Sequence, residues 1–205
     1  MASLSSSAVP HDAAFARCGE LACQKDSYQR TLTTTVISCA PRAVAPVAVA
    51  KGKKGKGGAA TGVASSSLAN APLLFDVVLA DTVLFPEGGG QPSDSGTVGG
   101  AACSGVENRD GVAVHVVEGP APLAVGDEVV VDVAWGRRWH NMGMHSCQHL
   151  LTALAVKLFS LETTSWGLGA EVSFLELATP TISDAQLKAL EVAANDGKGG
   201  VAEVT

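Results

Sequence analysis

Apolar and polar residues alternate with a period of two in several segments of the first two thirds of the chain. Residues 31–38 form a β-branched run that is typical of a half-buried strand. Residues 112–118 read VAVHVVE, and residues 128–135 place valines on one face and acids on the other. A longer apolar segment, residues 73–85, stops at a proline, which cannot donate to a strand ladder. Short strands between glycine and proline turns predict a small antiparallel barrel or sandwich as the first domain.

We place this β-barrel domain at residues 21–135 and expect two aperiodic segments beside and within it. Residues 1–20 begin with a serine- and alanine-rich stretch and are predicted to be a disordered extension. Residues 40–70 contain the run KGKKGKGG and a serine tract, which is the composition of a flexible insertion. The barrel is therefore predicted to form from two stretches of chain on either side of this insertion.

From residue 136 onward the spacing of apolar residues becomes that of helices. Apolar positions recur at steps of three and four over residues 141–159, which predicts an amphipathic helix whose apolar stripe is buried. A strand over residues 173–179 and a second helix over residues 181–194 follow, the helix beginning after a proline. Two helices and one strand do not close a core. We therefore expect the second domain, residues 136–205, to be incomplete within this chain.

The composition narrows the classes of partner. The 205 residues carry 14 Lys and Arg against 20 Asp and Glu, a formal charge of −6. Net acidity argues against a protein that holds DNA by bulk charge, although an enzyme can still meet RNA through a local patch. The longest uninterrupted apolar stretch, residues 43–50, is far shorter than the roughly 20 residues of a spanning helix. We expect neither a membrane nor DNA as a partner.

The cysteines and the N-terminus favour a cytoplasmic location. The five cysteines are odd in number and no two of them are separated by two residues, so neither a disulfide framework nor a zinc ribbon is indicated. The serine-rich start is similar to an organelle-targeting peptide, but Asp12 and Glu20 are atypical of one. Organelle targeting remains the alternative.

The segment HSCQH offers candidate metal ligands. His145 and His149 are four residues apart and therefore share one face of the predicted helix. Two imidazoles in this arrangement can bind one Zn²⁺. Ser146 stands where the HExxH motif of metalloproteases has its glutamate, and Cys147 falls on the opposite side of the helix, where we expect it to pack. Two ligands do not complete a zinc site, so ordinary histidines on a helix are the alternative.

A second candidate is the glycine-rich segment FPEGGGQPSDSG. Its three consecutive glycines, Gly88, Gly89 and Gly90, permit unusual backbone angles and the close approach of another group. Gln91 follows them with an amide that both donates and accepts hydrogen bonds. A turn at the end of a strand is one explanation, and the wall of a pocket is the other. The tripeptide GGQ also occurs in release factors that hydrolyse peptidyl-tRNA, which leaves a peptidyl-tRNA hydrolase as a weaker hypothesis.

Together the two segments resemble a known family. The stretch LADTVLFPEGGGQPSDSGTV, followed by VVVDVAWGRRWHNMGMHSCQHLLTALA, is similar to the trans-acting alanyl-tRNA editing proteins (the AlaX group), especially their longer eukaryotic members. The resemblance runs from residue 21 to residue 205, interrupted by residues 40–70. It implies a β-barrel followed by an α+β editing domain that is shared with alanyl-tRNA synthetase and in part with threonyl-tRNA synthetase.

The family resemblance also implies an activity. These proteins are zinc-dependent aminoacyl-tRNA deacylases that hydrolyse serine, and in some members glycine, from wrongly charged tRNA(Ala). The resemblance assigns His145 and His149 to the first two zinc ligands. It implies substrate contacts at Gly88, Gly89, Gly90, Gln91 and, less securely, at Thr163, a position linked to recognition of the serine hydroxyl. We see no residue that is clearly a catalytic general base.

Two departures and one ambiguity accompany this match. Family members supply two further zinc ligands from a later Cys-x-x-x-His segment, which this sequence does not contain. We therefore expect the chain to be the N-terminal portion of an editing protein. The alternative is an inactive module that binds tRNA without turnover.

Gly167 replaces a larger polar residue of the family. Arg137 and Arg138 match a basic pair at the domain junction, where either phosphate contacts or a structural ion pair is expected.

Overall fold

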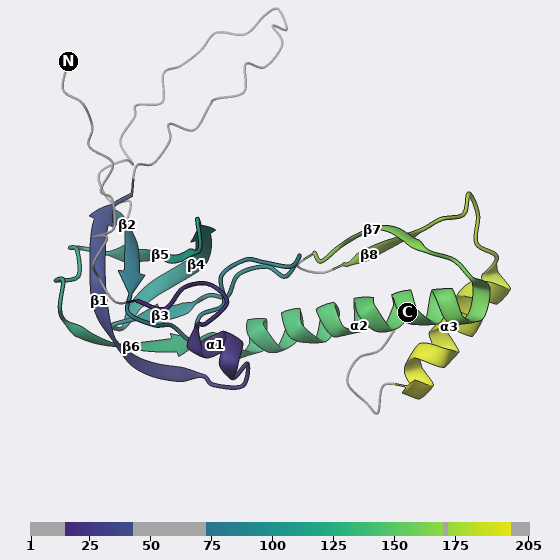
Figure 1. Cartoon of the computed structure of the whole chain (residues 1–205), viewed down its shortest axis with the longest axis horizontal. Coiled ribbons are helices and arrows are strands. Elements are labelled where there is room, and N and C mark those ends of the chain that lie inside the picture. The colour runs from purple at the N-terminus through teal and green to yellow at the C-terminus, as the bar shows by residue number, and fades with distance from the viewer. Residues whose placement is uncertain (1–14, 43–72, 170–171, 198–205) are drawn as a thin grey trace, which may run out of the picture.

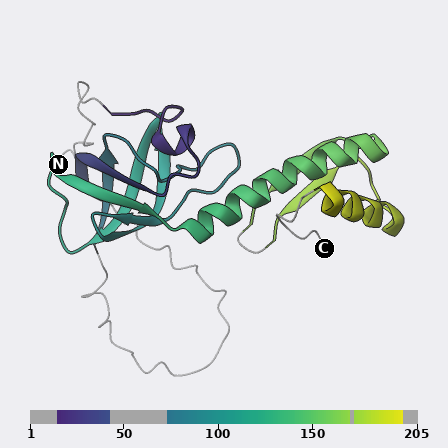
Figure 2. The same cartoon turned by 90° about the horizontal axis from the view of Figure 1, so that it is seen from below.

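The computed structural model describes residues 15–42, 73–169 and 172–197. A β-barrel lies at one end of an elongated molecule, and a long helix leads from it to a small unit of two strands and one helix (Figure 1). The second view shows that the two strands and the last helix both lie beside the far half of the long helix (Figure 2). No helix in these ranges is long and apolar enough to cross a membrane.

Six antiparallel strands close the barrel in the order β1-β2-β5-β4-β3-β6, so that neither end of the sheet is left as an open edge. The predicted barrel is therefore confirmed, and the sandwich alternative is excluded. The strands are β1 (Thr31–Pro41), β2 (Leu73–Leu79), β3 (Gly96–Val98), β4 (Ala101–Arg109), β5 (Val112–Gly119) and β6 (Glu128–Val133).

The barrel interior is filled by β-branched side chains from alternating strand positions. Val36, Val77, Val98, Val106 and Val131 come from five different strands and are almost completely buried. Valine suits these positions because a branched side chain packs well on a pleated surface. The same pattern made β1, β5 and β6 predictable from the sequence.

The predicted strand over residues 73–85 is too long. The strand β2 ends at Leu79, and the chain then leaves the sheet because polar side chains bind nearby backbone groups. The Asp81 carboxylate accepts hydrogen bonds from the Ala22 amide at 2.9 Å and from the Thr82 amide at 2.7 Å. The apolar residues that follow are buried beneath this turn rather than within a ladder.

The barrel also begins earlier than predicted. Residues 15–20 were expected within a disordered extension, yet the Ala16 amide donates to the Ala80 carbonyl at 2.7 Å and the Cys18 amide to the Gly111 carbonyl at 2.9 Å. A short helix, α1 (Ala22–Lys25), follows them. The remainder of the predicted extension, and nearly all of the predicted insertion at residues 40–70, lie outside the described residues; the first residues of that insertion belong to β1.

A buried histidine, His115 of β5, connects the neighbouring strand β2 to the turn that follows it. The Nδ1–H of His115 donates to the Val77 carbonyl at 3.0 Å, and its Nε2 accepts from the Thr82 hydroxyl at 2.8 Å. The Thr82 oxygen in turn accepts from the Leu84 amide at 3.0 Å. Burial lowers the pKa of His115 to about 4, with the Val77 hydrogen bond opposing the shift. The imidazole is therefore neutral at pH 7 and holds the strand and the following turn together.

This histidine makes the stability of the barrel sensitive to acid. Because the pKa of His115 is lower in the folded chain than in the unfolded one, the unfolded chain binds the proton more readily, and stability falls as the pH drops from about 6.5 towards 4. We expect the free energy of unfolding to fall by about 3 kcal/mol across that window. Urea unfolding at a series of pH values measures it. A His115→Asn variant should lose this part of the slope, and an unchanged slope would contradict the assignment.

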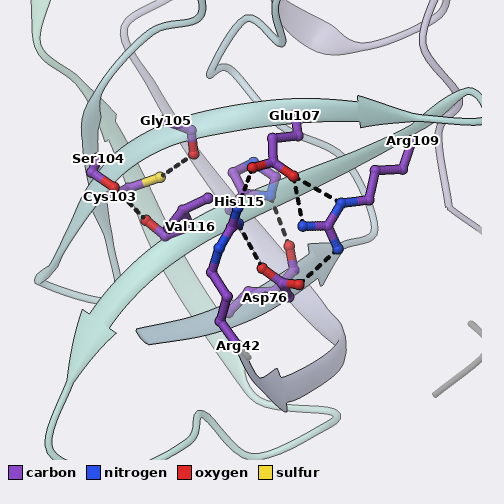
Figure 3. Close-up of polar contacts among 10 residues, drawn as sticks. Arg42, Asp76, Cys103, Ser104, Gly105, Glu107, Arg109, His115 and Val116 are labelled. Carbon is purple, nitrogen blue, oxygen red and sulfur yellow. Dashed lines mark hydrogen bonds and ion pairs between the residues drawn. The ribbon is translucent and has the colours of Figure 1, made fainter. Parts of the chain in front are cut away.

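Four charged side chains form a closed ring on the outer face of the barrel (Figure 3). Arg42 binds Asp76 at 2.9 Å and also binds Glu107. Arg109 binds Asp76 at 2.6 Å and Glu107 at 2.5 Å. Partial burial would raise the pKa of Glu107, but the hydrogen bonds and charges of the two arginines lower it. The ring connects the end of β1 to β2 and β4.

The second unit is built on a single helix, α2 (Trp135–Phe159), which starts six residues before the predicted helix. An antiparallel pair, β7 (Thr163–Gly167) and β8 (Phe174–Leu177), and the helix α3 (Asp184–Gly197) pack along it. The predicted strand and second helix are thus present with shifted ends, whereas β7 was not predicted. Ala155 of α2 and Ala194 of α3 are fully buried, which is what a close approach of two helices requires.

Candidate functional site

The face of α2 that turns inward is polar. Arg138, Asn141, His145, Gln148 and Thr152 follow one another at steps of three and four and therefore form one stripe along the helix. Three members of the stripe, at positions 138, 141 and 148, are buried. Burying a polar group costs free energy unless the group forms hydrogen bonds. An inward face with this many polar side chains therefore indicates a function beyond packing.

The buried face of α2 differs from the one that the apolar pattern predicted. Most of the predicted apolar positions are only partly buried in the described chain, and Leu158 is exposed. The amphipathic pattern identified the helix correctly but not the face that the barrel and β7 cover. The partly buried positions are Met144, Cys147, Leu151 and Leu154.

A buried ion pair fixes the start of α2 on the barrel. The Arg138 guanidinium forms an ion pair with the Asp94 carboxylate and also donates to the Ser27 carbonyl at 2.8 Å and the Val83 carbonyl at 2.5 Å. Of the two roles expected for the basic pair, the structural one therefore applies to Arg138. Arg137 is exposed and donates to the Ser93 carbonyl at 3.1 Å. The histidines further along α2 are positioned by this anchor.

The two predicted metal ligands lie against each other. The rings of His145 and His149 stack with their centroids 4.9 Å apart, and Trp166 of β7 stacks on His145 at 5.6 Å. Cys147 is partly buried and lies elsewhere on the helix, as the spacing predicts. The structure thus gathers both imidazoles and the Trp166 ring in one cluster, in which His145 is partly buried and His149 is exposed.

The glycine-rich segment forms a tight two-residue turn. The Gly88 amide donates to the Gln91 carbonyl at 3.2 Å, and the Gln91 amide donates to the Gly88 carbonyl at 3.0 Å. Gly89 and Gly90 between them have φ values of +58° and +80°, the positive pair that a type I′ turn requires and that favours glycine. The amides of Gly88 and Gln91 are engaged in the turn, and the substrate contacts expected of this segment stay a prediction.

This turn meets the second unit at Gly90. A Cβ atom added to Gly90 would lie 2.1 Å from Cη2 of Trp166, so only glycine allows the ring to pack here. At Gly89 the corresponding position has no atom of the described residues within 4 Å. Figure 1 shows the teal segment between β2 and β3 reaching from the barrel along α2 towards the end of β7 and the start of β8. The turn is therefore a contact between the barrel and the second unit.

Gln91 links the turn to the histidine pair. Its side chain is only 9% exposed, and its Oε1 lies 3.1 Å from Nδ1 of His145. Since an amide oxygen only accepts hydrogen bonds, Nδ1 carries the proton and Nε2 keeps a free lone pair. Burial, and then the charge of His149, lower the pKa of His145 and so favour its neutral form. Two residues 54 positions apart in sequence thus meet in one site.

The histidine pair and Gln91 line an open cavity of about 380 Å³ between the barrel and α2. Tyr28 and Trp139 form another part of its wall. Neither aromatic residue was predicted, since Tyr28 lies in an irregular segment whose position depends on the fold. Trp139 lies six residues before His145 on the same helix, a spacing that does not place the two side chains on one helix face, so no sequence signal indicates it either.

Thr163 does not line this cavity. Its hydroxyl lies 3.1 Å from that of Thr152, which also accepts a hydrogen bond from the Gln148 side chain at 3.1 Å. The Oε1 atom of Gln148 is buried and has no hydrogen-bond partner within the described ranges. The structure therefore places Thr163 beside the polar stripe of α2, next to an unsatisfied acceptor. Its expected role in recognising the serine hydroxyl stays a prediction.

The donor set matches part of a zinc site. His145 and His149 offer two nitrogen ligands, and the bond between Gln91 and Nδ1 is of the kind that orients a metal-binding histidine. A catalytic zinc site needs at least three protein ligands. Within residues 15–42, 73–169 and 172–197, no group of three or more His, Cys, Asp or Glu side chains comes together. These residues therefore fit half of a zinc site and do not complete one.

Proteins of known name are similar in sequence to this chain. The chain is 43% identical over 173 residues to the alanyl-tRNA editing protein Aarsd1 of Mus musculus, which covers 84% of the chain and 38% of that protein. Aarsd1 of Bos taurus is also 43% identical, over 85% of the chain and 35% of that protein. The chain belongs to the alanyl-tRNA editing protein family. This confirms the resemblance on which the site residues were predicted.

A more distant member of the family matches a shorter part. The alanyl-tRNA editing protein AlaX-L of Pyrococcus horikoshii is 33% identical over 108 residues, which covers 50% of the chain and 26% of that protein. No family model matches the chain. The chain spans little more than a third of the length of the Aarsd1 relatives in this family.

Proposed function

We propose that the chain contributes to the hydrolysis of the ester between serine and the 3′ end of wrongly charged tRNA(Ala), acting in trans. The contact between Gln91 and His145 is the observation that carries this proposal. It joins the glycine turn of the barrel to the histidine pair of α2 at one open cavity, which is the size of a small-molecule site. The relatives named for alanyl-tRNA editing support the same reaction class.

His145 and His149 would hold the zinc ion of this reaction together with ligands from outside the described residues. When bound, zinc supplies a Lewis acid for the ester carbonyl. Gln91 keeps Nε2 of His145 available by accepting the Nδ1 proton. Trp166 limits the movement of the His145 ring by stacking on it. The protein thereby positions the two imidazoles before any ligand arrives.

Discrimination between serine and alanine has a simple physical basis. Alanine lacks the hydroxyl of serine, so a site with buried polar groups that only serine satisfies rejects alanine strongly. Two polar atoms on the stripe of α2, Nδ2 of Asn141 and Oε1 of Gln148, are buried without a hydrogen-bond partner among the described residues and are the candidates for this contact. Glycine also lacks the hydroxyl, and its acceptance in some family members is a separate property.

The test is deacylation measured with purified chain and zinc. Serine-charged tRNA(Ala) should lose its amino acid faster than alanine-charged tRNA(Ala), and His145→Ala should abolish the difference. An extended protein that includes the later ligands is the comparison. If the extended protein alone is active, the described residues form an incomplete site. If neither protein is active, the assignment of the reaction is wrong.

An inactive tRNA-binding module is the second candidate, and the two-ligand site favours it. Such a module binds tRNA(Ala) with little zinc and without turnover. Zinc content per chain separates the candidates, because a stoichiometric metal contradicts the inactive module. We propose cytoplasm as the place of either activity.

The link between Gln91 and His145 predicts a measurable effect on zinc. Substituting Gln91→Ala removes the acceptor that orients the imidazole, and we expect zinc affinity to fall about 10- to 100-fold. Competition with a chromogenic chelator measures the affinity. Ser146→Ala, an exposed position between the two histidines, is the control and should bind zinc as the unchanged chain does. Equal affinity of the Gln91 variant would show that this hydrogen bond does not orient a ligand.

A further inference from the structure

Three aromatic rings gather where α2 leaves the barrel. Tyr28 lies 6.1 Å from Trp135 and 6.4 Å from Trp139, and the two tryptophans are 5.9 Å apart, all measured between ring centroids. The guanidinium of Arg30 lies over the Trp135 ring at 4.1 Å. We call these four residues the aromatic patch.

The aromatic patch faces solvent. Tyr28 is 62% exposed and Trp139 is 46% exposed, although rings of this size gain more from burial than most side chains. Exposed apolar groups that lie together, rather than singly, mark binding surfaces. The guanidinium of Arg30, which lies over the Trp135 ring, adds a positive charge to this surface. The surface is therefore both aromatic and locally basic, in a chain whose formal charge is −6.

The aromatic patch continues into the candidate site. Tyr28 and Trp139 belong to the patch and also line the cavity that contains Gln91 and the histidine pair. Trp139 precedes His145 by six residues on the same helix, which is a rise of about 9 Å. A ligand that places one end beside His145 therefore passes over the rings if it extends towards the barrel.

We propose that the aromatic patch stacks with the unpaired nucleotides of the tRNA 3′ end, while the cavity takes the charged terminal nucleotide. This proposal rests on the proposed function. Single-stranded nucleic acid is held by aromatic rings that stack on bases, together with cations that follow the phosphates. The rings of Tyr28, Trp135 and Trp139 and the guanidinium of Arg30 supply both elements. The stacking does not depend on base identity, so the patch contributes affinity and position rather than sequence specificity.

The test is binding of uncharged tRNA(Ala) to the 205-residue chain, followed by fluorescence anisotropy of labelled RNA. Trp139→Ala and Tyr28→Ala should each weaken binding about tenfold. Trp139→Phe, which keeps a ring, should restore most of the affinity. Leu158→Ala is the matched control, because it truncates another exposed apolar side chain on α2, far from the patch. Arg30→Ala should instead lower the dependence of binding on salt, by about one released counterion.

A shortened tRNA decides whether the rings meet the 3′ end. When the unpaired 3′ nucleotides are removed, the unchanged chain should bind more weakly, and Trp139→Ala should cause no further loss. Equal binding by Trp139→Ala and the unchanged chain would overturn the proposal. An equal loss on full-length and shortened tRNA would overturn it too, as would an unchanged chain that fails to bind tRNA. So would sedimentation that shows a dimer which Trp139→Ala separates, since a second copy would then cover the patch.

This experiment is independent of hydrolysis. If binding depends on the rings but serine-charged tRNA(Ala) is not hydrolysed by any form of the protein, the stacking proposal holds and the deacylase proposal fails. If hydrolysis occurs and the ring variants change neither binding nor KM, the deacylase proposal holds and the stacking proposal fails.

Discussion

Substituting Arg138→Ala should lower the free energy of unfolding by about 3–5 kcal/mol, the largest loss of stability that we expect from any single change in this chain. The guanidinium is buried and satisfies the Asp94 carboxylate and two backbone carbonyls. Its removal leaves Asp94 as an uncompensated buried charge, and one oxygen of that carboxylate already has no partner among the described residues. Urea unfolding at neutral pH measures the loss.

The neighbouring arginine provides the control for this prediction. Arg137→Ala removes the same kind of side chain from the next position of α2, but the residue is exposed and makes one bond to a carbonyl. We expect a change of less than about 1 kcal/mol. The double variant Arg138→Ala/Asp94→Ala should recover part of the stability, because the buried charge is then absent. Equal effects of the two arginine substitutions would refute a buried anchor.

Substituting Gly90→Ala should disrupt the contact between the glycine turn of the barrel and Trp166, which packs on the histidine pair. Alanine is strained at a φ of +80°, and its Cβ would also collide with the Trp166 ring. Relief of the collision moves the turn or the ring, and displacement of a catalytic group by about 1 Å can reduce turnover about 100-fold. We therefore expect a shift in Trp166 fluorescence and, in the active form of the protein, a loss of deacylation of that order.

Gly89→Ala distinguishes the collision from backbone strain. Gly89 also has a positive φ, +58°, but no atom of the described residues lies near the position of its added Cβ. This variant should lose about 1 kcal/mol of stability and keep the environment of Trp166. If the two variants behave alike, the close packing of Trp166 on the turn is not what requires glycine at position 90.

The barrel was predictable because its strands carry a clear period of two. Val129, Val131 and Val133 alternate with exposed positions in β6, and β1 is equally regular. The strand β4 escaped prediction because AACSGVENR is poor in β-branched and aromatic residues, and its place depends on pairing with β3 and β5. Local sequence does not contain such long-range partners.

The candidate site likewise has residues that the sequence predicts and residues that only the fold brings in. Both histidines and the glycine turn were identified from spacing and from family resemblance, without knowledge that Gln91 reaches His145. The polar stripe of α2 is present in the sequence at helical spacing. An apolar stripe with the same spacing lies on another face of the helix, and periodicity predicts that face to be the buried one. Trp166 fits the sequence pattern of the family, but its stacking on His145, like the place of Tyr28 in the cavity wall, depends on tertiary packing that local periodicity does not indicate.

The charged ring on the barrel lies beside the point where residues 43–72 are inserted between β1 and β2. Pro41 at the end of β1 pairs with Phe75 near the start of β2, and the Arg42 side chain is bonded to Asp76 of that neighbouring strand. The described residues on either side of positions 43–72 therefore belong to adjacent strands at one rim of the barrel. The entropy of closing a loop grows only slowly with its length, so segments of very different length can join these two strands at similar cost. This rim is thus a point where evolution can lengthen or shorten the chain while the cavity beside α2 keeps its geometry.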